Sequence, residues 1–386
     1  MVIKVKNRKF ISKIASLLSF STFLPSSTYG KLKTESPKVS VSNNTKNKTT
    51  KFIKNHKALI CAAASIASIA GYACFLKIYR SFRYHELLPE VNDEMLKSEF
   101  QIHFIDVGAG DCAVIKYGNK SWLVDAGYCL SRGITDVTNY LPEVNIKKLN
   151  GVILTHAHND HYWNLKYIFK KFDPEKFYHS YDHGIKAPID RIEKIQYESR
   201  LTEPIKNFKQ SKGDQSCVQV KAGDTIVKDG DLKIQVIGPT KEYQKENDNS
   251  IVLLIQYNNQ KILMMGDAGV ESEKDIMKFC SDKNIDISNC DLVKIGHHGS
   301  NTSSSSEFVN LTNPNTIVNS TGRNDFTLGL INLHEYPSII RRWINGNNRS
   351  KDKKCEALTT EEQKNIIVYY DRNNKELKYA RKKQVS

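Results

Sequence analysis

The chain has 386 residues, 39% of them hydrophobic, which suffices for one large folded domain with extensions. Its formal net charge is +15, but residues 100–370 carry 34 basic and 34 acidic side chains, so the excess lies at the two ends. Basic ends attract anionic lipid as readily as nucleic acid, so charge alone does not define a DNA-binding protein. The eight cysteines include no CxxC pair, which excludes a disulfide framework and a cysteine-type zinc site.

The first thirty residues have the composition of a secretion signal. Basic residues at positions 4–13 precede an apolar stretch over 14–24, and a cleavage point would follow Gly30. The apolar stretch contains serines and is too short to span a bilayer. Residues 31–57 are rich in Lys, Ser, Thr and Asn, and we expect them to form a basic, disordered linker.

Residues 58–76 form an uncharged run of nineteen positions, bracketed by Lys57 and Lys77. A helix of this length covers about 28 Å, close to the thickness of the bilayer hydrocarbon. We therefore predict a single transmembrane helix, with a buried core helix as the alternative. Eight lysines on its N-terminal side predict that this side stays cytoplasmic and that the downstream domain is exported. A cleaved signal peptide at the N-terminus would instead require the lysine-rich segment to be translocated.

Short apolar runs separated by turns begin near residue 98, and they predict one domain over 98–370 followed by a basic tail over 371–386. The predicted strands are 101–107, 112–117, 121–124, 151–154, 233–237, 251–257, 261–265, 292–295 and 316–319. Amphipathic helices are predicted at 163–172, 272–279 and 338–343. Helices that follow strand-end loops favour an α/β fold in which helices cover two packed sheets.

One motif combines four metal-binding side chains: His156, His158, Asp160 and His161 directly follow the apolar run 152–155. Imidazole and carboxylate are ligands for divalent zinc, iron or manganese. Alternate residues of an extended segment point the same way, so the first two histidines can reach one metal. If a helix follows, the aspartate and the last histidine face a second position, and paired cations form a hydrolytic device. The alternative is a solvated, histidine-rich loop.

Two further motifs follow predicted strands. The predicted strand 261–265 is followed by Gly266 and then by Asp267. The carboxylate of Asp267 could bridge two cations or belong to an ordinary turn. His297 and His298 lie between glycines after 292–295. The two rings cannot both face one metal from an extended segment, so we expect one ligand and one hydrogen-bond donor or acid that faces the substrate. A surface loop with two neutral histidines is the alternative.

Aspartates also end the first strands. Asp106 and Asp111 enclose a Gly-x-Gly turn, where they could line a site or cap turns. The turn lacks the longer glycine fingerprint of dinucleotide sites, which excludes a nucleotide cofactor there. Asp125 ends the run 121–124 and is a candidate to orient a ligand histidine.

Together these motifs resemble the metallo-β-lactamase superfamily, and most closely the hydrolase domain of ComEC-like competence proteins. The resemblance covers residues 100–345 and rests on motifs that occur in order at 104–111, 123–127, 154–161, 247–254, 265–268 and 294–300. It implies a four-layer αββα sandwich with a dinuclear site at one edge of the paired sheets. The combination of two motifs, His-x-His-x-Asp-His and His-His-Gly-Ser, is specific for the fold and much less specific for the substrate.

The resemblance also implies residue roles around two divalent cations, zinc first, with manganese or iron as alternatives. His156 and His158 would bind the first metal, Asp160 and His161 the second, and Asp267 would bridge them. His298 resembles the ligand of the histidine pair, and His297 would then contact a phosphate oxygen. Further candidates for the pocket are Asp106, Asp111, Asp125, Asn249, Lys294 and His334, and Lys294 and Arg323 could hold phosphate.

The sequence departs from the family pattern at three points. Tyr162-Trp163 replaces the usual pair of glycines, and these aromatics could narrow the entrance, stack on a base or fill the core. Ala109 replaces the usual glutamine of the Gly-x-Gly turn. Many members have a further histidine ligand, for which only His179 and His183 are available, both soon after the first motif. We leave that position to water or substrate.

The predicted reaction is metal-assisted hydrolysis, in which Asp160 or Asp267 orients the water nucleophile and His297 or a cation stabilises developing charge. The favoured function is a membrane-anchored phosphodiesterase or nuclease, with nucleic acid as a candidate partner. One alternative is a hydrolase for a carbonyl substrate, such as a lactone, thioester or β-lactam. Another is a metal-binding, non-catalytic module at the membrane. The sequence leaves the oligomeric state open.

Overall fold

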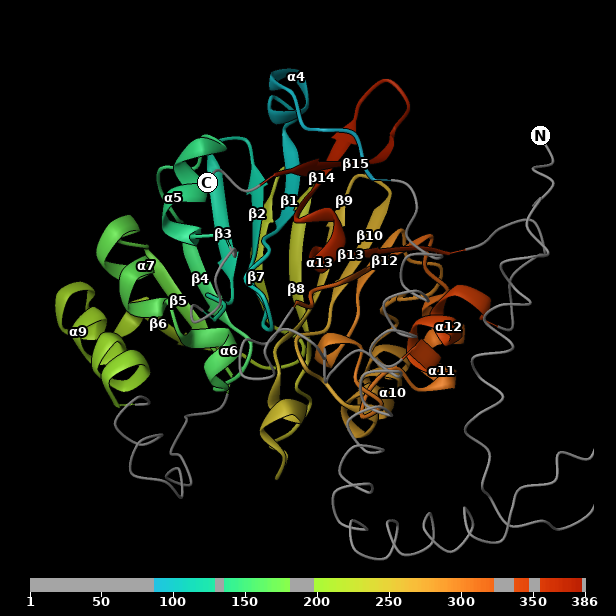
Figure 1. The fold of residues 1–386 in the computed structure, drawn as a ribbon. Helices are drawn as coiled ribbons and strands as arrows, with labels where there is room; N and C mark the ends of the chain where they lie inside the picture. The colour runs from blue at the N-terminus through green and yellow to red at the C-terminus, as the bar shows by residue number, and fades with distance from the viewer. Residues whose placement is uncertain (1–86, 129–134, 181–197, 323–336, 347–354, 384–386) are drawn as a thin grey trace, which may run out of the picture. The chain divides into compact units, whose positions relative to one another are not determined.

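The computed structural model describes residues 87–128, 135–180, 198–322, 337–346 and 355–383, all within one structural unit (Figure 1). The predicted signal-like segment, basic linker and transmembrane helix, residues 1–76, lie outside the described residues. Among the helices that are described, none is both long and apolar enough to cross a bilayer.

Within the described residues, one sheet has eight strands in the order β15-β14-β1-β2-β3-β4-β5-β6. Neighbours are antiparallel from β15 to β3 and parallel from β3 to β6. The strands are β1 (Phe100–Phe104), β2 (Ala113–Tyr117), β3 (Lys120–Val124), β4 (Gly151–Leu154), β5 (Lys176–His179), β6 (Cys217–Gln219), β14 (Asn365–Asp371) and β15 (Glu376–Lys382).

The second sheet in the described part of the chain has seven strands in the order β13-β12-β11-β10-β9-β8-β7. Here β13, β12, β11 and β10 are parallel to one another, and β10 to β7 are antiparallel. The strands are β7 (Thr225–Asp229), β8 (Leu232–Gly238), β9 (Val252–Tyr257), β10 (Gln260–Met264), β11 (Leu292–Lys294), β12 (Thr316–Asn319) and β13 (Glu356–Thr359).

The two sheets pack face to face over a shared apolar core. Side chains alternate between the two faces of a strand, so Phe100, Ile102 and Phe104 of β1 all enter this core and are completely buried. Tyr257 of β9 meets them from the other sheet and stacks on Phe100 with ring centroids 4.5 Å apart. Central strands such as β1, β4, β11 and β12 are buried on both faces.

Helices cover the outer face of each sheet, which gives four layers, αββα (Figure 1). On one side, α5 (Val137–Glu143), α7 (Leu165–Phe172) and α9 (Glu203–Lys212) pack on the eight-stranded sheet. On the other, α10 (Val270–Asp282), α11 (Ser306–Thr312) and α12 (Pro337–Asn345) pack on the seven-stranded sheet. The short elements are α4 (Asp93–Leu96), α6 (Asn159–Tyr162), α13 (Thr360–Gln363), η1 (Glu198–Thr202), η2 (Asp214–Ser216), η3 (Glu246–Asn249) and η4 (His297–Gly299).

All nine strands predicted from the sequence are present, with ends that differ by at most three residues, and the three predicted helices correspond to α7, α10 and α12. The fold extends past residue 370, where the sequence predicted a basic tail. Glu376–Lys382 instead forms β15, paired along its length with β14. Leu377 and Ala380 are buried in a strand that also carries four charged side chains, Glu376, Lys378, Arg381 and Lys382, and charged side chains are common on edge strands. The tail interpretation missed this strand because charge masked its apolar pattern.

Candidate metal centre

Three strand-end loops carry the candidate site. β4 ends at Leu154 and leads into the first histidine motif, β10 ends at Met264 just before Asp267, and β11 ends at Lys294 just before the histidine pair that contains His298. β10 and β11 are parallel neighbours, so their carboxyl ends lie at the same edge of the sheet. The loop after β4 belongs to the other sheet, so the site lies where the two sheets meet.

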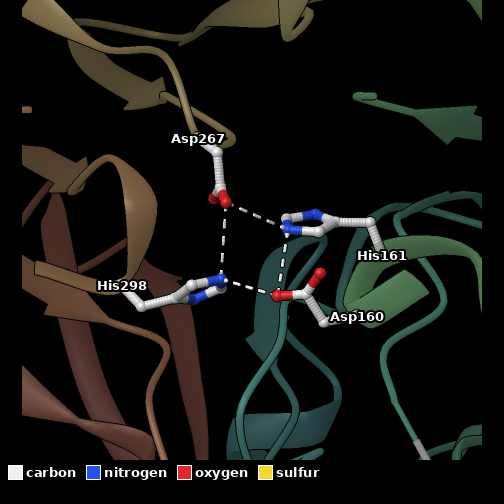
Figure 2. Close-up of side chains that lie close together, drawn as sticks. All are labelled: Asp160, His161, Asp267 and His298. Carbon is white, nitrogen blue, oxygen red and sulfur yellow. Dashed lines mark ion pairs between the residues drawn. The ribbon is translucent and has the colours of Figure 1, made fainter. Parts of the chain in front are cut away.

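Asp160, His161, Asp267 and His298 form what we call the second cluster, in which one ligand atom from each lies within 4.8 Å of the others. Figure 2 shows the four side chains pointing toward a common point. Asp267 Oδ2 lies 3.4 Å from His161 Nε2 and 3.6 Å from His298 Nε2. Asp160 Oδ2 lies 3.3 Å from His298 Nε2 and 3.8 Å from His161 Nε2.

His156, His158 and Asp267 form the first cluster, within the same limit of 4.8 Å. His156 Nε2 lies 3.0 Å from His158 Nδ1 and 3.8 Å from Asp267 Oδ2. The first histidine is completely buried and the second is exposed, so this cluster opens toward solvent. Asp267 belongs to both clusters, as a carboxylate that bridges two cations must.

Unsatisfied polar atoms test whether a cation fits here. Among the described residues, His161 Nε2 and Asp267 Oδ1 are buried without a hydrogen-bond partner. Native structures rarely leave buried polar atoms unpaired, and a cation held by the second cluster would satisfy both. Imidazoles and carboxylates together suit zinc, manganese or iron. The donor set therefore fits divalent metal without selecting one of these three.

The carboxylates create a strongly negative environment in the second cluster. Burial by itself would lower the pKa of His161, but Asp267 and Asp125 raise it well above its ordinary value. Burial also acts to lower the pKa of His298, yet Asp267 and its neighbours raise it to about 10. The same potential that holds protons on these rings attracts a divalent cation in their place.

Asp267 and His156 have the protonation states that metal ligands need. Burial would raise the pKa of Asp267, but His298 and His161 bring it well below its ordinary value, so this carboxylate stays ionised. Burial, followed by the charge of His161, holds the pKa of His156 well below its ordinary value. The His156 ring is therefore neutral, which is the form that binds metal.

Hydrogen bonds orient the histidines of the second cluster. His161 Nδ1 lies 2.8 Å from Asp125 Oδ2, and because a carboxylate only accepts, the proton is on Nδ1 and Nε2 is left for a metal. Thr155 holds that carboxylate in turn, donating to it from N and from Oγ1 at 2.8 Å each. His298 Nδ1 donates to the Ser320 carbonyl at 2.9 Å, which likewise directs Nε2 into the cluster.

Both rings of the histidine pair approach Asp267, but only His298 belongs to a cluster of metal-binding side chains. His297 Nε2 lies 3.9 Å and His298 Nε2 3.6 Å from Asp267 Oδ2. The prediction of a single ligand in this pair assumed an extended segment, but the two residues have φ of 46° and 52°. Consecutive left-handed residues turn the chain so that neighbouring side chains converge, and such strain is typical of functional sites.

His297 also has polar neighbours that sequence reasoning missed. Its Nδ1 lies 2.6 Å from Thr302 Oγ1, and Asn247 Nδ2 lies 3.3 Å from both ring nitrogens. The side chain of His297 is 18% exposed, so it can meet a substrate at the rim of the site. Asn247 begins the motif at 247–254, and that position was the available signal.

Two of the pocket candidates instead stabilise loops. Asn249 exchanges hydrogen bonds with the backbone of Tyr243, accepting from N at 2.7 Å and donating to O at 3.0 Å. Asp106 accepts from the Gly108 backbone at 3.3 Å and pairs with Lys364 at 3.3 Å. Their assignment to the pocket rested on sequence motifs, which do not distinguish a turn-capping side chain from a substrate-facing one.

The aromatic pair after the first motif fills the core. Tyr162 and Trp163 are each only 4% exposed. The Arg200 guanidinium covers the Trp163 ring at 3.8 Å from its centroid, and the Tyr128 ring lies 5.0 Å away on tilted planes. Of the roles considered for this pair, burial favours core filling over base stacking. Arg200 was not anticipated, because its partner lies 37 residues earlier in the chain.

The remaining sequence candidates divide into two groups. His179, at the end of β5, is buried and stacks on Phe177 with centroids 5.7 Å apart, and it is in neither cluster. His183, Arg323 and His334 lie outside the described residues. Asp111 joins Asp125 and His161 in a third group of close donor atoms beneath the second cluster, and Lys294 pairs with Asp111 in the interior.

The sequence model of the metallo-beta-lactamase superfamily matches residues 105–321. ComE operon protein 3 of Bacillus subtilis is 25% identical over 248 residues, which are 60% of this chain and 29% of that protein. Recombination protein 2 of Haemophilus influenzae is 24% identical over 233 residues, 60% of this chain and 25% of that protein. The chain thus matches less than a third of the length of either relative, and both agree with the ComEC-like branch that the motifs indicated.

Among solved structures, CmlA, a diiron beta-hydroxylase from Streptomyces venezuelae, is 14% identical with a TM-score of 0.44. The alignment covers 74% of this chain and 54% of CmlA. Similarity at this level concerns the fold alone.

Proposed function

The chain belongs to the metallo-beta-lactamase superfamily, and from this premise we propose that it is a membrane-anchored, dinuclear metal-dependent hydrolase of phosphodiester bonds. The observation that carries the proposal is the position of Asp267, which is shared by two clusters of metal-binding side chains. The ComEC-like relatives support a phosphodiester substrate, with nucleic acid as the proposed partner.

In this proposal His156, His158 and Asp267 hold one cation, and Asp160, His161, Asp267 and His298 hold the other. When bound, two divalent cations, zinc, manganese or iron, would lower the pKa of a water and polarise the scissile phosphoryl group. All the other contributions come from the chain itself, which fixes its ligands in advance and so avoids reorganisation during the reaction.

The nearby side chains have distinct proposed tasks. Asp160, whose side chain is 25% exposed, accepts a hydrogen bond from the attacking water and orients it. His297 donates to a phosphate oxygen, and its contacts with Thr302 and Asn247 hold its ring in place. Asp125 keeps His161 in the tautomer that presents Nε2. Positioned donors and acceptors of this kind contribute on the order of 10²–10⁴-fold to rate.

Metal content and substrate choice test this function together. Protein purified without chelator is analysed for zinc, manganese and iron, and is then assayed with bis-p-nitrophenyl phosphate, single-stranded DNA and a lactone. We expect two metals per chain and turnover of the first two substrates. Asp160→Ala and Asp267→Ala should abolish turnover with the fold retained, while Asp229→Ala, which removes an exposed partner of Lys120, should leave it unchanged.

Each other outcome favours a different function. Turnover of the lactone alone would favour a carbonyl hydrolase. Two bound metals without turnover of any substrate would favour a non-catalytic module. A folded protein that contains no metal and takes none up would overturn hydrolysis by this site altogether.

The proposed anchor is residues 58–76, with the catalytic domain outside the cytoplasm. External protease should digest the domain in intact cells, and the protein should sediment with membranes unless residues 1–76 are deleted. Protection in intact cells with digestion after lysis would place the domain in the cytoplasm. A deletion variant that still sediments with membranes would show that these residues are not the anchor.

A further inference from the structure

A buried ion pair connects the two sheets directly beneath the second cluster. Lys294 is the last residue of β11 and is 2% exposed. Its neighbours Val293 and Ile295 face the helices of their own sheet, so alternation turns the lysine toward the other sheet. There its Nζ pairs with Asp111 Oδ2 from the loop before β2, which is also buried.

Both partners contact segments that carry metal ligands. Lys294 Nζ also donates to the Gly266 carbonyl at 3.0 Å, directly before Asp267 in the chain. Asp111 N donates to the backbone oxygen of Asp160 at 3.3 Å, and Asp111 Oδ1 lies 3.5 Å from His298 Nδ1. One ammonium group thus contacts the backbone next to Asp267 and, through Asp111, lies close to the Asp160 backbone and the His298 ring.

Stability alone is a poor explanation for this pair. Burying a lysine and an aspartate removes both charges from water, and an apolar pair of similar volume often stabilises a core as well or better. The small space beside the pair is lined by apolar side chains such as Phe104, Ala113 and Met264, and also by polar residues, Asp125, Thr155 and Ser320. A charged pair in such a core is more simply explained by what its charges do for adjacent groups.

The pair also changes the charge balance of the site. Asp111, Asp125, Asp160 and Asp267 bring four carboxylates to the clusters and the group beneath them, which formally equals the charge of two divalent cations. Lys294 then adds one positive charge beneath the second cluster. That charge favours an anionic group in the site, because electrostatic interactions are strong where water is excluded.

We propose that Lys294 is a positioning residue of the metal centre. Through Asp111 it holds His298 and the Asp160 loop, and through the Gly266 carbonyl it holds Asp267. Its ammonium is buried and occupied by these partners, so it acts from below the metals and does not bind substrate phosphate, the role that the sequence allowed. The inference rests on the metal site of the proposed function and is independent of the substrate.

The test is a double-mutant cycle on the full chain: Lys294→Met, Asp111→Asn and the two combined. Lys261→Met is the matched control, because it removes a lysine–aspartate pair from the neighbouring strand, where Asp286 is the partner. The affinity for Mn²⁺ or Zn²⁺ is measured by competition with a chromophoric chelator, together with the Co²⁺ absorption spectrum and the melting temperature of the metal-free protein.

Each single variant should bind the second metal about 10–100-fold more weakly, as is typical when a group that orients a metal ligand is lost. The double variant should lose much less than the product of the two single losses, because neither unpaired charge then remains. Lys261→Met should stay within about twofold of the unmodified chain. The Co²⁺ spectrum should change in the single variants, which a purely structural lysine would not cause.

Two results would overturn the proposal. In one, Lys294→Met or Asp111→Asn melts at lower temperature but binds both metals with unchanged affinity, so the pair only stabilises the fold. In the other, the double variant loses metal affinity by the full product of the two single losses, so the lysine does not act through Asp111. If Lys294→Met does not fold, the near-isosteric Asp111→Asn decides alone. A chain that binds two metals but cleaves no phosphodiester would contradict the proposed function and leave this inference intact.

Discussion

Asp267 is the residue on which both clusters depend, because its carboxylate is the only group that belongs to each of them among the described residues. Its surroundings keep it ionised: His298 and His161 lower its pKa well below the ordinary value despite burial. No other described residue shares this position, whereas His158 belongs to one cluster only.

Asp267→Asn should therefore remove both metals, while His158→Ala should remove or weaken one. We expect Asp267→Asn to lose activity by more than about 100-fold, the upper range for loss of a group that only supports a ligand. Metal per chain, measured after gel filtration, distinguishes the two variants. Equal metal content in both would mean that Asp267 does not bridge.

Asp125 acts one step further from the metals, through His161 Nδ1. Asp125→Asn keeps the shape but presents an amide that can donate, so the imidazole can adopt the wrong tautomer. We expect metal affinity and activity to fall by about 10–100-fold. Asp106→Asn is the matched control, since Asp106 is a buried aspartate that caps a turn. It should lower the melting temperature without weakening metal binding, and equal effects on metal affinity would refute the distinction.

At the scale of elements, the site depends on close approach between loops that no single motif encodes. A Cβ at Gly110 would lie 2.4 Å from the backbone oxygen of Asp160, so the loop before β2 and the first histidine motif touch without room for a side chain. On the other sheet, Glu273 of α10 accepts hydrogen bonds from Ser304 and Ser305, which stabilises the loop after the histidine pair. The ligands are thus held by neighbouring loops and not only by their own strands.

Gly110→Ala should push the Asp160 loop away and lower the metal affinity of the second cluster about 10–100-fold. The effect on metal binding should be larger than the effect on folding. Gly118→Ala is the control, because its Cβ would meet nothing within 4 Å. The control still places alanine at a φ of 56°, which costs about 1 kcal/mol. Isothermal titration with Mn²⁺ compares the two variants. Similar metal affinities would show that the close approach does not position Asp160.

At the scale of the whole molecule, the layers are joined by buried polar groups whose ionisation affects stability. His103 of β1 lies under α5, with Nδ1 2.9 Å from Tyr140 Oη and Nε2 3.0 Å from Gln101 Oε1. The Gln101 amide donates elsewhere through Nε2, so its oxygen accepts a hydrogen bond from His103 Nε2. Burial, helped by the positive charge of Lys116, lowers the pKa of His103 to about 3.

Acid should therefore destabilise the fold through His103. The unfolded chain binds a proton near pH 6.5 and the folded chain only near pH 3, so the unfolded state binds more protons in this window. The stabilisation is complete above about pH 6.5 and is lost as pH falls toward 3, by about 1.4 kcal/mol per pH unit.

His103→Gln removes this ionisation. In urea unfolding of metal-free protein, the difference in unfolding free energy between the unmodified chain and the variant should shrink as pH falls from 6.5 to 5. Other ionisable groups are common to both proteins and cancel in the comparison. A difference that stays constant over this range would contradict the assigned pKa.

The sequence by itself determined what is local. The first motif places four donors within six residues, and nine strands follow from short apolar runs, because alternation and chain turns are properties of neighbouring residues. The family followed from the order of these motifs. The missed strands β5 and β15 have charged or polar residues that interrupt the apolar pattern. β14 was also missed, although its centre is an uninterrupted apolar run.

Only the tertiary structure decided which distant groups meet. Asp111 and Lys294 are 183 positions apart, and nothing in either motif predicts that they pair between the sheets. The same holds for Asn247 beside His297, and for Asn249, which binds a backbone instead. Motif spacing constrains side chains within one loop, whereas the packing of two sheets sets which loops share an edge. The metal-binding side chains of the site can therefore be identified from the sequence, whereas the groups that hold them in position are brought together only by the fold.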